Sequence, residues 1–148
     1  MSNLYVPLDA EYANDEKIIA AGPYAELVYV RALALAKRLL SDGRISQHHR
    51  ATLTLGLTPK QATEAVNRLV TDLTGRGALW AVDGTGWLIV AWAKRNKSAD
   101  QVHEAREQKA AAGALGNHRK WHTASRPSAK CEHCEREGWT RTLSLIHI

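Results

Sequence analysis

The most regular pattern of apolar and polar residues lies between Thr58 and Leu73. Thr58 at the cap, Pro59 at the first helical position and Gln61 three residues after the cap form a capping box. At about 100° per residue, the apolar side chains that follow make one stripe: Ala62, Ala65, Val66, Leu69, Val70 and Leu73. Of these we expect Ala62, Val66, Leu69 and Leu73 to be buried. This stretch therefore predicts an amphipathic helix over residues 58–73.

The residues before this helix also show helical patterns, separated by turns. We expect Asn14 to cap a short helix that Gly22 and Pro23 end, because neither residue continues a helix without a cost. A longer helix should follow over residues 24–40, then a brief strand at 44–46 and a short helical segment over 48–55. The predicted order up to residue 73 is therefore helix, helix, strand, helix, capped helix.

After the capped helix the pattern becomes that of strands. Residues 78–82 and 87–92 are rich in β-branched and aromatic residues and flank a turn at 83–86, which predicts a hairpin. A polar helix without a broad apolar stripe should begin after Ser98 and extend to about Ala112. The predicted fold class is mainly α with a small β-hairpin: a winged helix-turn-helix domain followed by a polar helix and a basic Cys/His tail.

We divide the chain into residues 1–97, a winged-helix DNA-binding domain, 98–114, a polar linker helix, 115–139, the tail, and 143–148. The last part, Leu143–Ile148, is what CTG TCT CTT ATA CAC ATC encodes, a string similar to a transposon end used to tag DNA for sequencing. We therefore interpret it as encoded by an adapter and leave it out of fold prediction. The alternative is a natural apolar strand.

Composition and charge narrow the class of protein. A chain of 148 residues, 45% hydrophobic and 24% charged, fits one small globular domain with an appendage and excludes collagens, coiled coils and chains disordered throughout. It lacks a long apolar run and a secretory signal, so we expect a cytoplasmic protein without membrane contact. Residues 106–130 hold six basic residues and one acidic residue, a net charge of +5 that equals that of the whole chain. This segment should attract phosphates.

Three short motifs resemble the N-terminal domains of phage replisome organisers and related primosomal proteins. They are Asn14–Ile18 (NDEKI), Gly43–Ile45 (GRI) and Gly56–Ala62 (GLTPKQA), and the resemblance covers roughly residues 4–97. The chain is also similar to helix-turn-helix proteins of phages that infect actinobacteria. The resemblance implies a winged-helix domain that binds double-stranded DNA, homo-oligomers that form near a replication origin, and a C-terminal part that contacts replication proteins such as a helicase or its loader.

The polar face of the capped helix carries side chains suited to DNA. Asn and Gln can pair bidentately with adenine and Arg with guanine, while Lys and Thr can hold phosphates. The predicted DNA-binding residues are Lys60, Gln61, Thr63, Asn67 and Arg68 on this helix and Arg119 and Lys120 in the tail. Of these, Lys60, Gln61, Asn67 and Arg68 should face solvent. We expect Glu64 to brace Arg68 through an i,i+4 pair. The alternative is a merely solvated face.

The tail has the residues of a metal site at His118, His122, Cys131 and Cys134. Two imidazoles one helical turn apart and two thiolates on a knuckle suit tetrahedral zinc, which would hold their donor atoms about 3 to 4 Å apart. The tail has few apolar residues beyond Leu115, Trp121 and Trp139. We therefore predict one zinc ion whose binding and the folding of the tail are a single event.

Three other interpretations of the tail stay open. His133, between the cysteines, is a rival ligand. The tail could instead be a disordered basic arm in which the histidines and cysteines share no purpose. A redox CxxC is less well supported, because such motifs stand at a helix start in a βαβ unit, a context that this sequence lacks.

Together these features favour a non-enzymatic DNA-binding protein that acts in replication initiation. A winged-helix transcriptional regulator is the alternative, because it would use the same surface. A third class is an adaptor whose winged helix binds protein and whose tail docks a helicase or polymerase. An enzyme would be a degenerate metal nuclease of the His-Asn-His type built on Asn117, His118, His122 and the cysteines. It lacks the paired catalytic histidine, the later asparagine and a second CxxC, so we expect no catalytic residues.

Overall fold

A computed structural model describes residues 4–123 and 126–139. The chain divides into two compact units, Met1–Ala99 and Asp100–Ile148, which are described separately. The segment Leu143–Ile148 and its interpretation as adapter-encoded lie outside the described residues.

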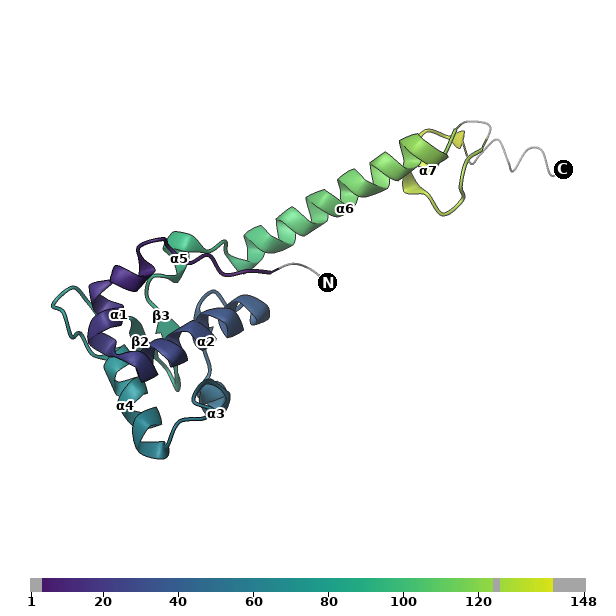
Figure 1. The fold of residues 1–148 in the computed structure, drawn as a ribbon. Helices are drawn as coiled ribbons and strands as arrows, with labels where there is room; N and C mark the ends of the chain where they lie inside the picture. Colours follow the sequence, from purple (N-terminus) through teal and green to yellow (C-terminus); the bar gives the residue numbers. More distant parts are fainter. Residues whose placement is uncertain (1–3, 124–125, 140–148) are drawn as a thin grey trace. The chain divides into compact units, whose positions relative to one another are not determined.

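The first unit is mainly helical and carries a small antiparallel sheet (Figure 1). Its helices are η1 Tyr12–Asn14, α1 Glu16–Ala21, α2 Pro23–Leu39, η2 Gln47–His49, α3 Arg50–Leu53, α4 Pro59–Val70 and α5 Trp92–Arg95. Its strands are β1 Arg44–Ile45, β2 Trp80–Asp83 and β3 Gly86–Ile89. The predicted fold class, mainly α with a small hairpin, is confirmed, and the predicted elements occur in the predicted order.

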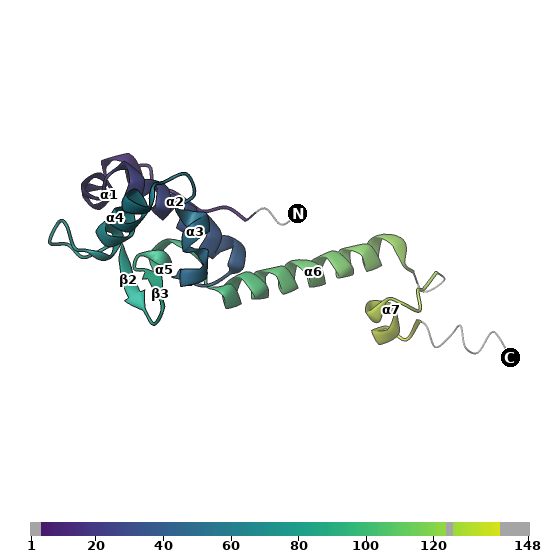
Figure 2. The ribbon, with the colours of Figure 1, turned by 90° about the horizontal axis from the view of Figure 1, so that it is seen from below.

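The core of the first unit forms where α1, α2 and α4 pack together (Figure 2). α2 contributes small residues such as Ala32 and Ala36, both fully buried, which let α4 approach closely. α4 contributes Ala65 and Leu69 from its apolar stripe, and Trp80 closes the core from β2. The polar face of α4 is left outside this core.

The sheet has the strand order β1-β3-β2, so β3 is central. β2 and β3 form the predicted hairpin, with Trp80 opposite Ile89 and Asp83 opposite Gly86. Gly84 in the turn has φ +60°, which glycine adopts without strain. A Cβ on Gly86 would lie 2.1 Å from the carbonyl oxygen of Ile45, so only glycine lets β1 pair this closely with β3.

Two predicted helix ends are wrong. Asp15, not Asn14, caps α1: its side chain accepts a hydrogen bond from the Lys17 backbone N–H at 2.8 Å, while Asn14 belongs to the preceding 3₁₀ turn. α4 ends at Val70 because Thr71 is extended (φ −100°, ψ 136°). Leu73, expected in the buried stripe, therefore leaves it and is 44% exposed.

Other predicted boundaries shift as well. The segment expected over 48–55 is the 3₁₀ turn η2 followed by the single turn α3, which buries Leu53. The strand predicted over 87–92 ends at Ile89, and Trp92, its last predicted residue, instead begins the short helix α5 and is buried.

The second unit consists of most of α6, Ala99–Trp121, and of α7, Glu132–Arg136. α6 begins directly after Ser98 as expected but extends beyond Ala112, through the predicted boundary between residues 114 and 115. The added turns contain Ala, Leu, Arg and Lys, which favour helix and outweigh Gly113 and Gly116. None of the described helices combines the length and apolar character needed to cross a membrane.

Candidate metal centre and nucleic-acid interface

The four predicted metal ligands converge at the C-terminal end of α6. One donor atom from each of His118, His122, Cys131 and Cys134 lies within 4.8 Å of the others. His118 lies in the last turn of α6 and His122 directly follows that helix, while Cys131 caps α7 and Cys134 lies within it. The widest separation exceeds the predicted edge of about 4 Å, but the four residues that spacing singled out are brought together.

His118 stands at the centre of this cluster and is only 2% exposed. Its Nδ1 lies 3.3 Å from the Cys134 Sγ and 3.5 Å from the Cys131 Sγ. Its Nε2 lies 3.3 Å from an oxygen of Glu137, outside the cluster. One ring nitrogen therefore faces the sulfurs while the other faces a carboxylate, an arrangement that orients metal-binding histidines in other proteins. Sequence reasoning missed Glu137.

Aromatic rings cover the His118 imidazole. Trp139 stacks on it at 4.8 Å between ring centroids, and the ring of His133 lies 5.6 Å away. His133, the rival ligand, is not among the four converging residues and instead packs beside His118. The cluster is thereby partly shielded from water.

The two thiols differ in acidity. A hydrogen bond from the Cys134 backbone, with smaller contributions from His122 and His118, lowers the pKa of Cys131 to about 6. Burial raises the pKa of Cys134, although the Ser128 backbone N–H donates to its sulfur at 3.4 Å. Cys131 is thus the more acidic of the two thiols, and the thiolate is the form that binds metals and attacks disulfides.

The setting of the CxxC differs from expectation in one respect. Cys131 is the N-cap of α7, so the motif does stand at a helix start. The described strands lie in the first unit and form an antiparallel sheet, so no βαβ unit surrounds the motif in the described chain. Both cysteines are free thiols. A helix start, one of the two features expected of a redox CxxC, is therefore present, whereas the βαβ unit is not.

Four of the five predicted DNA-binding residues of α4 share one surface. Lys60, Thr63, Asn67 and Arg68 line an open groove along the helix, and all four are exposed. The side chains of Lys60 and Asn67 form no hydrogen bond or ion pair with any described residue. These two are consequently available to a ligand.

Gln61 and Arg68 are already engaged within the first unit. The Gln61 side chain accepts from the Thr58 backbone N–H at 3.0 Å, completing the capping box, and Gln61 is half-buried rather than exposed. Arg68 donates to Glu64 at 3.2 Å, as expected, and also to the carbonyl oxygen of Ala20 at 3.2 Å. Either residue would have to give up these contacts to read a base.

The remaining candidates lie on either side of this surface in the sequence. The Thr63 hydroxyl accepts a hydrogen bond from Arg50 of α3 at 3.1 Å, which ties α3 to α4. Arg119 and Lys120 are exposed in the last turn of α6, within the second unit. They therefore belong to a different compact unit from α4.

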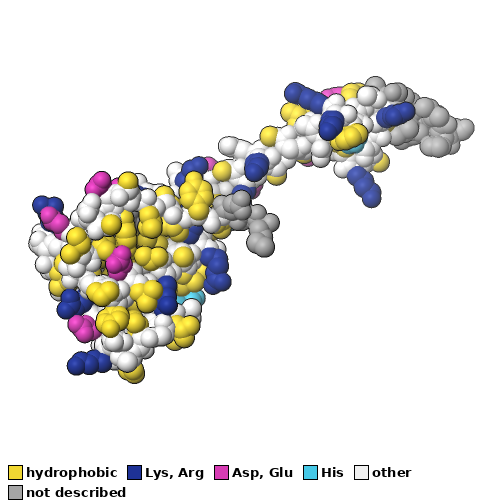
Figure 3. Space-filling model, viewed as in Figure 1, with side chains coloured by type: hydrophobic (Ala, Val, Ile, Leu, Met, Phe, Trp, Pro, Cys, Tyr) yellow, Lys and Arg dark blue, Asp and Glu magenta, His cyan; other side chains and the backbone are white. Residues whose placement is uncertain are grey.

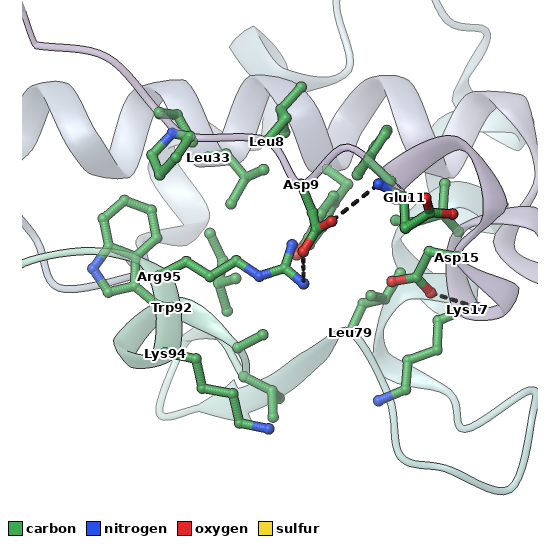
Figure 4. Close-up of a pocket in the computed structure, with 18 of the residues that line it drawn as sticks. Leu8, Asp9, Glu11, Asp15, Lys17, Leu33, Leu79, Trp92, Lys94 and Arg95 are labelled. Atoms are coloured by element: carbon green, nitrogen blue, oxygen red, sulfur yellow. Dashed lines mark hydrogen bonds and ion pairs between the residues drawn. The ribbon is translucent and has the colours of Figure 1, made fainter.

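A cavity of about 540 Å³ in the first unit was not foreseen from the sequence (Figure 4). The N-terminal segment folds over α2 and α5, and Arg95 pairs with Asp9 at 3.2 Å across it. Burial, followed by the Glu26 carboxylate, raises the pKa of Tyr12 in its wall to about 12, so the phenol stays protonated. The segment has neither periodicity nor a motif that could have signalled this cavity.

Comparison of the chain with models of known protein families, with curated proteins and with solved structures finds no match.

Proposed function

We propose that the chain is a non-enzymatic DNA-binding protein whose first unit is a winged helix. In this proposal α4 enters the major groove of double-stranded DNA and the hairpin β2–β3 is the wing. The observation that carries it is the division of α4 into a buried face and a polar face on which Lys60 and Asn67 are free. An amide and an ammonium on an exposed helix are the groups that read adenine and hold a phosphate.

Replication initiation is the role that the resemblance favours, with transcription control as the alternative. Homo-oligomers at the DNA and contacts with a helicase or its loader belong to the replication role, and a cytoplasmic location fits both. Identification of the DNA sites that the full chain binds separates the two roles: clustered sites at a replication origin support the first, and single sites before genes support the second.

The DNA-binding proposal is tested on a duplex selected from random sequences for binding to the full chain. Asn67→Ala should lower affinity for that duplex by about 1 to 3 kcal/mol and leave binding to random duplex nearly unchanged. Asn14→Ala, which removes an exposed asparagine from η1, is the matched control. Equal losses on both duplexes would contradict base recognition by α4.

We further propose that His118, His122, Cys131 and Cys134 bind one zinc ion. Two sulfurs and two imidazoles suit tetrahedral zinc, and the buried Nδ1 of His122 has no hydrogen-bond partner among the described residues. An unpartnered buried nitrogen is costly, and a metal ion bound through this atom would satisfy it. Zinc would supply a fixed cross-link here, and the chain's own residues would orient the ligands, with Glu137 contacting the His118 ring.

Native mass spectrometry of the full chain, with and without a chelator, tests the zinc site. Wild type should carry one zinc ion under reducing conditions, and Cys134→Ser should carry none. His133→Ala is the matched control, because His133 lies beside the cluster without belonging to it, and it should retain zinc. A wild-type chain that holds no zinc but readily forms a Cys131–Cys134 disulfide would favour the redox alternative.

A further inference from the structure

Trp121 differs from the other tryptophans of the chain in its exposure. Of the five, Trp80 and Trp92 are buried and Trp87 and Trp139 are half-buried, whereas Trp121 is 65% exposed. Single exposed apolar residues are common on proteins, so exposure alone assigns no role.

The surroundings of Trp121 are positively charged. Arg119 and Lys120 precede it and are exposed, and the Lys120 Nζ lies 4.8 Å from the centre of the indole ring. No acidic residue occurs in the sequence between Glu107 and Glu132. Lys and Arg side chains are visible along the second unit in Figure 3. Basic residues also suit the end of a helix, but that role requires no exposed aromatic ring.

The position of Trp121 in the chain makes its ring a defined platform. It lies between His118 and His122, two of the converging residues, in the last turn of α6. The His122 backbone N–H donates to the His118 carbonyl oxygen at 2.9 Å, which continues the helical hydrogen bonding past Trp121. A metal ion held by both histidines would fix the backbone on either side of the indole.

We infer that Trp121, with Arg119 and Lys120, is a stacking site for a base of a single-stranded nucleic acid. An exposed flat ring beside cations offers both contacts that such strands use, stacking on the base and attraction of the phosphate. In a duplex the base faces are covered and only their edges are accessible. A protein partner would require a wider apolar surface than one ring flanked by charges.

This inference deepens the proposed DNA-binding function, since it adds an unpaired strand to the duplex expected at α4. The experiment uses the zinc-loaded full chain and fluorescence anisotropy of a labelled oligothymidylate of about 15 nucleotides, the upper range of single-strand sites. An oligouridylate of equal length forms a second arm and tells a DNA strand from an RNA strand. Zinc content is measured for every variant.

Trp121→Ala should weaken binding of oligothymidylate by about 5- to 150-fold, the range found for loss of one stacking contact, and Trp121→Phe should recover most of it. Lys120→Ala should reduce the salt slope by about 0.7, one phosphate contact on a single strand. Tyr5→Ala, which removes a ring 76% exposed in the first unit, is the matched control and should bind as wild type.

A Trp121→Ala variant that binds both oligonucleotides within twofold of wild type would overturn the inference, as would a Trp121→Phe variant as weak as Trp121→Ala. These outcomes are independent of α4. If Asn67→Ala has no effect on the selected duplex while Trp121→Ala still loses oligothymidylate, the duplex proposal fails and the strand-binding site stands.

Discussion

The two units of this chain are held together by different kinds of contact. The first unit buries an apolar core of aliphatic and aromatic side chains from α1, α2, α4 and the sheet. In the described part of the second unit the only buried residues are His118 and Cys134. One unit thus depends on removing apolar surface from water, whereas the other is organised around polar atoms that an ion can join.

The two units should differ in how well they tolerate the loss of a single side chain. A core distributes its stabilisation over many contacts, so loss of one side chain weakens the fold without removing it. A four-ligand cluster in a segment with few buried side chains should depend strongly on each ligand, because little apolar burial orders the chain around it. Variants of the first unit and variants of the second should therefore differ in how much stability they lose and in which unit the loss occurs.

Removal of zinc should produce the largest effect and confine it to the second unit. Zinc binding to small peptides contributes an apparent 10–16 kcal/mol at about neutral pH, which acts as folding free energy. Chelation should abolish amide-exchange protection in residues 115–139 and leave α2 and α4 protected. Equal loss of protection in α2 and α4 would mean that the units do not fold independently.

Leu69→Ala should produce the next largest effect, in the first unit only. Leu69 is fully buried in the core, so its truncation should lower the free energy of unfolding by about 2–5 kcal/mol in a urea titration. Leu55→Ala, at a side chain 70% exposed, is the control and should stay within about 0.5 kcal/mol of wild type. Both variants should keep their zinc; loss of zinc from Leu69→Ala would contradict the separation.

The same difference explains which features could be predicted from the sequence. The capped helix, the hairpin and their order follow from local signals that agree with the packing: the capping box, the apolar stripe and the turn at 83–86. The N-terminal end of α1 was misplaced because two neighbouring residues could each act as its N-cap. Asp15 takes the cap from Asn14 because Asn14 is already in a 3₁₀ turn and its amide donates to Glu11.

The candidate metal site also has residues that local sequence signals predict and residues that only the tertiary fold brings in. Ligand spacing was sufficient to find His118, His122, Cys131 and Cys134, because helix periodicity and the CxxC knuckle place each pair locally. Glu137 and Trp139 could not be found, since their contacts with His118 arise from how the chain returns to α6. The hydrogen bond from Arg68 to the carbonyl oxygen of Ala20 is likewise a tertiary contact between distant segments, which the sequence pattern does not show.

Glu137→Gln changes the contact with His118 without removing any of the four proposed zinc ligands. Partners that orient ligating histidines typically contribute 10–100-fold to metal affinity, so zinc binding measured by competition with a chelator should weaken by that factor. Glu135→Gln changes an exposed carboxylate on the same helix and is the matched control. If the two variants bind zinc equally well, Glu137 does not position His118.

Thr58→Ala should give the smallest of these effects and again leave the second unit unchanged. The Thr58 hydroxyl accepts from the Gln61 backbone N–H at 3.2 Å, and the Gln61 side chain accepts from the Thr58 backbone N–H at 3.0 Å. Loss of an N-cap typically costs about 0.5–2 kcal/mol, which a urea titration can resolve. Thr52→Ala, at an exposed threonine of α3, should cost less than about 0.5 kcal/mol.

Because α4 of the Thr58→Ala variant remains folded in most molecules, its duplex affinity should fall far less than that of Asn67→Ala. A loss as large as that of Asn67→Ala would show that the cap itself, rather than the polar face beyond it, makes the principal contact with DNA.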